Sequence, residues 1–173
     1  ALRSDGSVVA WGGTGFGGSS SAIDFDGPVN NLDVTQVFST RAAFAALRND
    51  GSVVAWGDAN YGGNASGVDF DGPVDRLKVA QIYSNYYAFA ALRDDGSVVT
   101  WGSADHGGAS GGIDFDGPAN NLKVARIFSN YGAFAALLSD GSVIAWGDYG
   151  NGGDASGVDI DGPANNLKVT DIF

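Results

Sequence analysis

Cysteine, methionine and glutamate are all absent from this chain of 173 residues. Without cysteine, disulfide bonds and thiolate metal sites are excluded. Without glutamate, all 20 acidic residues are aspartate, and aspartate together with 28 glycines favours turns over helices. We therefore expect short strands joined by tight turns and almost no helix. Because methionine is missing even at the first position, we expect a processed product or part of a longer chain.

Basic residues are also scarce. Nine Lys and Arg residues are scattered singly along a chain whose net charge is −11. Such a surface repels phosphate backbones, so we expect no nucleic-acid partner. No apolar run approaches the length of a membrane span. The hydrophobic content of 44% is typical of a folded globular protein.

The most prominent feature of the chain is one unit that occurs four times. It has the form Ala-Leu-Arg-x-Asp-Gly-Ser-Val-Val-x-Trp-Gly, with Leu138 and Ile144 as departures in the last copy, and lies at 1–12, 46–57, 91–102 and 136–147. Its tryptophans are 45 residues apart, at Trp11, Trp56, Trp101 and Trp146. A fixed period of this length indicates a repeat array or a propeller. We treat residues 1–173 as a single repeat domain.

Each repeat is expected to contain four short strands. Val34–Phe38 alternates apolar and polar residues, which predicts a first, half-buried strand. The continuous apolar run Ala43–Leu47 predicts a second strand buried on both faces. A turn containing Asp-Gly then leads to a third strand at Ser52–Trp56. After a Gly-rich loop at 58–67, the alternating residues at 68–71 predict a short fourth strand at the sheet edge.

Four such repeats predict an all-β propeller of four 45-residue, four-stranded blades. The chain starts inside the second strand of a repeat and ends on a first strand, Lys168–Phe173. Strands from both termini would complete one composite blade and close the ring, which removes exposed sheet edges. The alternative is part of a larger ring, either a segment of a longer propeller or one of two copies. The two-copy ring implies self-association through the repeat ends.

The hairpin unit resembles the repeat of the regulator of chromosome condensation family, whose members are β-propellers. The likeness lies in Ala-Phe-Ala-Ala-Leu-Arg-x-Asp-Gly-Ser-Val-Val-x-Trp-Gly and extends to the loop at Tyr61-Gly62-Gly63. The family usually has a longer Gly-Gln-Leu-Gly type element there. The shorter repeat is most similar to the compact variant found in tandem in large bacterial surface or secreted proteins. The resemblance therefore implies an extracellular or cell-surface location. It does not imply nucleotide exchange on a small GTPase, because the loops responsible have no counterpart here.

Paired aspartates in an Asp-x-Asp-Gly-Pro motif are the candidate metal ligands. Carboxylate pairs beside a glycine turn suit Ca²⁺. The set is incomplete, however, because no glutamate follows to finish a calcium loop. The alternative is a solvated strand edge whose charges deter pairing with another sheet, with no cofactor. The residues are Asp24, Asp26, Asp69, Asp71, Asp114, Asp116, Asp159 and Asp161.

Loop positions that differ among otherwise uniform repeats are the candidates for ligand binding. Aromatic and polar residues on the loops of a rigid scaffold suit a protein or glycan ligand. Relaxed constraint on exposed loops explains the same variation. The tryptophans are expected in the core between blades, because each occupies the same strand position. The variable residues are Phe16, Tyr61, His106 and Asn151 at one repeat position, and Arg41, Tyr86 and Tyr131 at another.

No catalytic constellation can be assembled from this sequence. His106 has no nucleophile or metal partner in the pattern, and hairpin geometry explains the aspartates of the Asp-Gly turns. The Gly-Gly pairs precede no expected helix, so they do not form a phosphate loop. We therefore predict a non-catalytic structural or protein-interaction module. The alternative is a calcium-dependent or carbohydrate-binding adhesion domain.

Overall fold

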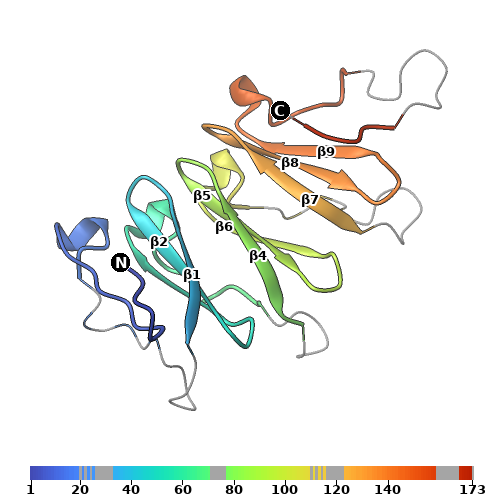
Figure 1. The fold of residues 1–173 in the computed structure, drawn as a ribbon. Coiled ribbons are helices and arrows are strands. Elements are labelled where there is room, and N and C mark those ends of the chain that lie inside the picture. Colours follow the sequence, from blue (N-terminus) through green and yellow to red (C-terminus); the bar gives the residue numbers. More distant parts are fainter. Residues whose placement is uncertain are drawn as a thin grey trace.

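The computed structural model describes residues 1–19, 21, 23, 25, 33–70, 77–109, 111, 113, 115, 123–158 and 168–172. These residues form three antiparallel sheets of three strands, in the orders β1-β2-β3, β4-β5-β6 and β7-β8-β9. The three sheets lie side by side in a row that follows the order of the chain, with the two termini at opposite ends of the row (Figure 1). The expected all-β architecture is confirmed, and this arrangement is consistent with a β-propeller.

The strands recur at the period of the sequence repeat. The first strands are β1 (Val34–Ser39), β4 (Val79–Ser84) and β7 (Val124–Ser129). The central strands are β2 (Ala43–Arg48), β5 (Ala88–Arg93) and β8 (Ala133–Leu138). The third strands are β3 (Val53–Gly57), β6 (Val98–Gly102) and β9 (Val143–Gly147). These bounds agree with the expected strands to within one residue at each end.

Helical structure in the described part of the chain is limited to four single turns of 3-10 helix. They are η1 (Thr14–Phe16), η2 (Ala59–Tyr61), η3 (Ala104–His106) and η4 (Tyr149–Asn151). The last three each follow a third strand and η1 follows the N-terminal hairpin, all within stretches that the sequence predicts as plain loop. Among the described residues, no helix has the length and apolar character needed to cross a bilayer.

The central strands contribute most of the core, and β5 is packed by a neighbouring blade on each of its faces. In β5, Phe89, Ala90 and Ala91 are fully buried, as the continuous apolar run predicts. Phe89 and Ala91 pack toward the preceding sheet, whereas Ala88 and Ala90 pack toward the following one. Alanine on both faces allows the sheets to approach closely, because it adds little thickness to the strand.

The tryptophans of the second, third and fourth copies fill the space between blades. Trp101 is only 3% exposed, stacks on Phe89 at 5.1 Å and meets the edge of Phe70 at 5.1 Å. Its indole Nε1–H donates a hydrogen bond to the carbonyl of Gly62 at 3.0 Å. Trp56 and Trp146 repeat these contacts, so the expected core position is confirmed for three copies. The fourth, Trp11, is 72% exposed.

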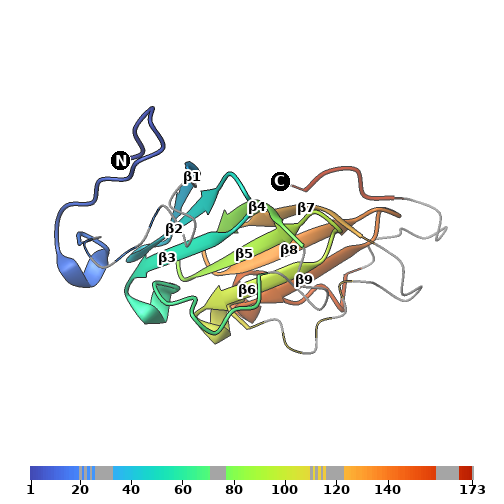
Figure 2. The ribbon, with the colours of Figure 1, turned by 90° about the horizontal axis from the view of Figure 1, so that it is seen from below.

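The N-terminal hairpin differs from the expected pair of strands. It contains one isolated bridge, between Leu2 and Val8, and it projects from the end of the row (Figure 2). Its turn still has the geometry of the others, with Arg3 N–H donating to the carbonyl of Ser7 at 2.9 Å. A two-stranded hairpin is only marginally stable without further strands, which explains the loss of regular pairing here.

The fourth strand and the closed ring are also absent from the described part of the chain. Residues 68–70 form no strand, and the remainder of that segment lies outside the described residues. The C-terminal segment 168–172 is extended without strand pairing, and it lies at the opposite end of the row from the N-terminus (Figure 1). The described chain is thus an open row of three sheets, in place of the four closed blades expected.

A tyrosine-rich loop face as candidate binding site

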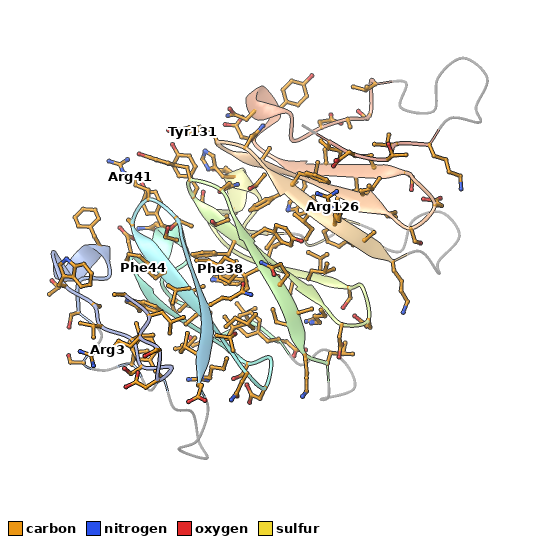
Figure 3. The ribbon with its side chains drawn as sticks, viewed as in Figure 1. Arg3, Phe38, Arg41, Phe44, Arg126 and Tyr131 are labelled. Carbon is orange, nitrogen blue, oxygen red and sulfur yellow. The ribbon has the colours of Figure 1, made fainter. Side chains whose placement is uncertain are left out.

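The turns between first and second strands lie at one end of the three sheets. Arg41 and Tyr131 come from the outer two of these turns and lie near one another (Figure 3). Backbone hydrogen bonds join the turns across the blades: Arg41 N–H donates to the Tyr86 carbonyl at 3.0 Å, and Tyr86 N–H donates to the Tyr131 carbonyl at 3.2 Å. The three turns therefore present one continuous surface.

Each turn is also tied to the 3-10 helix of its own blade. The Asn85 side-chain amide donates to the His106 carbonyl at 2.7 Å, while its oxygen accepts from Tyr87 N–H and Ala88 N–H. Asn130 makes the same bond to the Asn151 carbonyl, at 2.6 Å. The Thr40 hydroxyl bonds to the Tyr61 carbonyl at 3.0 Å. These bonds bring the two variable repeat positions together in every blade.

Aromatic side chains from all three blades and a cation from the first meet on this surface. The rings of Tyr86 and Tyr131 stack at 4.8 Å, and Tyr86 also meets the edge of Tyr87 at 4.9 Å. The guanidinium of Arg41 lies 5.5 Å from the Tyr86 ring centre and 5.9 Å from that of Tyr61. At these distances cation–π attraction and stacking reinforce each other.

Tyr87 is the centre of the cluster. It stacks on His106 at 3.9 Å and on Tyr61 at 5.6 Å, and it meets Tyr131 edge-on at 5.5 Å. The hydroxyl groups of Tyr87 and Tyr131 are hydrogen-bonded at 2.9 Å. This hydrogen bond, reinforced by desolvation and by the neighbouring tyrosines, raises the pKa of Tyr87 to about 12. Its hydroxyl is therefore neutral at physiological pH.

His106 is held from both sides. Its Nδ1 lies 2.9 Å from the Ser103 hydroxyl and its Nε2 lies 3.8 Å from the Asp148 carboxylate. The ring thus has polar partners at both nitrogens and the Tyr87 ring against its face. These contacts fix the orientation of the His106 ring, which in turn supports the Tyr87 ring stacked on it. We name the set of Arg41, Tyr61, Tyr86, Tyr87, His106 and Tyr131 the tyrosine face.

A shallow groove runs along the tyrosine face. It has a volume of about 490 Å³ and takes three consecutive residues from each turn, at 39–41, 84–86 and 129–131. The serines at the first of these positions are identical, whereas the third position carries Arg41, Tyr86 or Tyr131. The groove is therefore lined by polar side chains from every turn, together with one guanidinium and two aromatic rings.

Five of the seven variable residues predicted from the sequence meet in the tyrosine face. Asn151 lies at its margin, where a side chain added at Gly132 would come within 3.1 Å of the Asn151 amide and 3.2 Å of the His106 ring. Phe16 lies apart on η1 and is 62% exposed. Sequence reasoning missed Tyr87. The signal was available, because its repeat position carries alanine at 42 and glycine at 132.

The predicted calcium motif lies almost entirely outside the described residues and stays a prediction. Among the eight aspartates only Asp69 is described; it is exposed, and its backbone carbonyl accepts a hydrogen bond from Arg93. The other seven lie outside the described residues. Within the described part of the chain, no three His, Asp or Glu side chains gather in a way that could hold a metal ion.

The aspartates of the Asp-Gly turns have structural roles. The Asp140 carboxylate accepts hydrogen bonds from the Ser142 hydroxyl at 2.6 Å and from Ser142 N–H at 2.9 Å. Asp5, Asp50 and Asp95 bond to their own serines in the same way. Each side chain closes its turn, so the interpretation of these residues as turn formers agrees with the structure.

Asp140 is expected to make folding dependent on pH. The bond from the Ser142 hydroxyl, followed by that from the backbone, lowers the pKa of Asp140 from its ordinary value of 3.8. Because the folded-state pKa is the lower one, the ionised side chain stabilises the fold above about pH 4, and this is lost as the pH falls through the folded pKa. In Asp140→Asn, the fall in melting temperature between about pH 5 and pH 2 should be smaller than in wild type.

Asp105→Asn is a matched control for this experiment, because Asp105 is exposed on η3 and the change removes the same charge. Its melting temperature should depend on pH as that of the wild type does. If the melting temperatures of Asp140→Asn and the wild type fell equally with pH, the stabilising role of the turn carboxylate would be contradicted.

Comparisons with known proteins find partial similarity to solved structures at low identity. No protein-family model and no curated protein sequence matches the chain. Among solved structures, human WBSCR16 is similar over 70% of this chain at 24% identity, with a TM-score of 0.48. The CRINKLY WD40 ectodomain of the Arabidopsis thaliana receptor kinase ACR4 is similar over 68% of this chain at 16% identity, with a TM-score of 0.42. Yeast RCC1 (Prp20), solved with bound Kap60, is similar over 67% of this chain at 20% identity, with a TM-score of 0.47. The chain spans 36%, 37% and 30% of these structures, respectively.

Proposed function

We propose that this chain is a non-catalytic protein-interaction module that binds its partner on the tyrosine face. The observation that carries the proposal is the convergence of the variable loop residues. Six aromatic or basic side chains from three blades contact one another beside a groove of about 490 Å³.

The chemistry of this surface suits a protein partner. Tyrosine offers a large, flat area and a hydroxyl group while losing little conformational entropy on binding, and tyrosine and arginine are enriched among the residues that dominate interface energies. Tyr131 is 54% exposed and Arg41 is exposed beside it, so both are accessible to a ligand. The rings are held by their mutual contacts before binding, which lowers the entropy lost on association.

The finer architecture that we propose is a β-propeller of the type that the hairpin sequence resembles. Three equivalent antiparallel sheets, fanned about their first strands, support this (Figure 1). An extracellular or cell-surface location is proposed from the sequence resemblance alone.

Peptide display provides a direct test of the proposed function. A random peptide library is selected on the wild-type protein, and the enriched peptides are measured by biolayer interferometry. The double variant Tyr86→Ala/Tyr131→Ala should weaken their binding at least about tenfold, because it removes the stacked pair that borders the groove. Melting temperatures measured in parallel should show both proteins folded.

Phe16→Ala is the matched control, because Phe16 is an exposed aromatic residue outside the tyrosine face. It should bind the selected peptides as wild type does. A library that yields no peptide sensitive to the double variant would overturn the proposal. A glycan array run with the same proteins tests the carbohydrate alternative, and glycan binding lost in the double variant would favour that ligand over a protein.

A further inference from the structure

Arg41 differs from the other basic residues in the described part of the chain. Arg48 and Arg93 are buried, and each donates a hydrogen bond from its guanidinium Nε–H to a backbone carbonyl, at 2.8 and 2.9 Å respectively. Arg126 forms an ion pair with Asp171 at 3.1 Å. The charges of these three arginines are thus already engaged by other groups of the protein.

The remaining described basic residues lie away from the tyrosine face. Arg3 is near Asp5 on the N-terminal hairpin, and Figure 3 shows it far from Arg41. The lysines lie beside the Asp-Gly turns that join second and third strands, at the opposite end of each sheet from the turns of the tyrosine face. These lysines are Lys78, Lys123 and Lys168. Within the described ranges, Arg41 is therefore the only arginine or lysine on the tyrosine face.

Two aromatic rings hold the guanidinium of Arg41. It lies 5.5 Å from the Tyr86 ring centre and 5.9 Å from the Tyr61 ring centre, and within the described part of the chain it forms no hydrogen bond and no ion pair. Asp58 begins η2 next to the Arg41 turn, but its carboxylate accepts from the N–H and the side-chain amide of Asn60, at 2.9 and 3.1 Å. The two tyrosines lie on η2 and between β4 and β5, so the whole contact is formed by described residues.

A guanidinium held in this way is suited to bind an anion. When arginine stacks on aromatic rings it uses the faces of its planar group, and the N–H donors at the edges stay available in a fork that matches a carboxylate. A guanidinium is also more weakly hydrated than an ammonium, so pairing it costs less desolvation. The rings order the side chain before binding, which lowers the entropy lost on association. A carboxylate that enters the groove at Arg41 therefore meets donors that the described chain leaves unused.

The rings next to Arg41 define the second part of the ligand. Tyr86 and Tyr131 stack at 4.8 Å beside the groove, and Tyr131 is 54% exposed. The successive separations of 5.5 and 4.8 Å place the Tyr131 ring within about 10 Å of the guanidinium, which an extended peptide spans in about three residues. A carboxylate at Arg41 therefore brings side chains up to about three positions away onto the tyrosine rings.

We propose that the tyrosine face binds an acidic segment of its protein partner. The carboxylate of an aspartate or glutamate pairs with Arg41, and an apolar side chain within about three residues packs on Tyr86 and Tyr131. Acidic recognition rests on the protein-interaction role proposed above and adds the charge and the spacing of the ligand. Asp148, which follows β9 and faces His106 at 3.8 Å, disfavours the reverse orientation, because it places a carboxylate at the other side of the face.

The net charge of −11 is compatible with an acidic ligand. At physiological ionic strength, exposed charges more than about 8 Å apart are largely screened from one another. The distant aspartates therefore contribute little repulsion, and the guanidinium in direct contact with the ligand dominates.

Peptides selected from a random display library on the wild-type protein test this recognition. Those that lose affinity in Tyr86→Ala/Tyr131→Ala should be enriched in aspartate or glutamate within about three positions of an apolar residue. In biolayer interferometry, replacing that acid by its amide in the peptide should weaken binding at least about tenfold, and so should Arg41→Gln in the protein. The two changes together should weaken binding little more than either alone, because both remove the same ion pair.

Arg3→Gln is the matched control, because it removes the same charge from the N-terminal hairpin, away from the tyrosine face (Figure 3). It should bind the selected peptides as the wild type does. The affinity of Arg41→Lys should lie between those of the wild type and Arg41→Gln, because an ammonium keeps the charge but lacks the planar fork.

Exchange of the charges provides the decisive test. Arg41→Glu should lose the acidic peptides and should bind, at least about tenfold more tightly than the wild type does, the same peptides with lysine in place of the acid. A misfolded variant could not gain this affinity. Peptides that require Tyr86 and Tyr131 but carry no acid, or that bind Arg41→Gln as they bind the wild type, would overturn the acidic ligand and leave the proposed function standing. If no selected peptide is sensitive to the double tyrosine variant, both proposals fail.

Discussion

Replacement of Trp101 by alanine is expected to lower the free energy of unfolding by about 3–5 kcal/mol. The indole is 3% exposed and contacts Phe70 and Phe89, so its removal leaves a cavity between two blades. It also leaves the Gly62 carbonyl without its indole donor. Because small domains are stable by only about 5–15 kcal/mol, this change should bring the protein close to unfolding. Urea denaturation followed by circular dichroism measures the effect.

Trp11→Ala is the matched control, as it makes the same substitution at the equivalent position of the first repeat. Trp11 is 72% exposed, so its loss should change the unfolding free energy of dilute protein by less than about 0.5 kcal/mol. The loss of unfolding free energy in Trp101→Phe should lie between the losses in Trp101→Ala and Trp11→Ala, because phenylalanine keeps most of the buried area but lacks the indole N–H. Similar values for Trp101→Ala and Trp11→Ala would show that the contact between blades contributes little to stability.

Gly57→Ala is expected to destabilise the fold by about 2–5 kcal/mol, the sum of backbone strain and overpacking. Gly57 has φ +114 at the end of β3, which favours glycine. An added Cβ would lie 2.5 Å from the Ala42 carbonyl oxygen and 2.7 Å from the Ala43 Cα. Both are backbone atoms that cannot shift without breaking local bonds: Ala43 begins β2 and pairs with Gly57, and the Ala42 carbonyl accepts a hydrogen bond from Asp58 N–H at 2.9 Å.

Gly12→Ala separates the two contributions. Gly12 has nearly the same φ, +113, but a Cβ there would meet no atom within 4 Å. Its hairpin is also held by a single bridge and can relax. We expect a loss of less than about 1 kcal/mol in thermal or urea unfolding. Equal losses at both glycines would show that strain alone, rather than close packing against β2, explains the requirement for glycine.

Local regularities of the chain account for most of the fold. The apolar run at Ala43–Leu47 predicted the buried central strand, and the repeated Asp-Gly-Ser turn predicted its hairpin connection. The 3-10 helices were missed, because a single turn such as Ala59–Tyr61 has no periodic pattern. It is held by Asp58, whose carboxylate accepts from Asn60 N–H at 2.9 Å, and is ended by Gly62 at φ +92.

Part of the candidate site could also be found by comparing the repeats. Differences among the copies identified Arg41, Tyr86 and Tyr131, although they gave no indication that these residues touch. Their contact depends on the ladder of backbone bonds between blades and on Asn85, which binds the next loop of its own blade. Tyr87 was overlooked because its equivalents, alanine and glycine, gave the position no polar or aromatic character outside one copy.

The sequence by itself determined the repeating unit, its strand order and the residues of its core, because short-range periodicity and turn chemistry act within a few residues. The tertiary structure alone decided which repeats obtain a neighbour. The same Trp-Gly sequence is buried at Trp56, Trp101 and Trp146 and exposed at Trp11. Burial of a tryptophan requires the glycine and the apolar face of another unit, and that pairing is a property of how the blades stack.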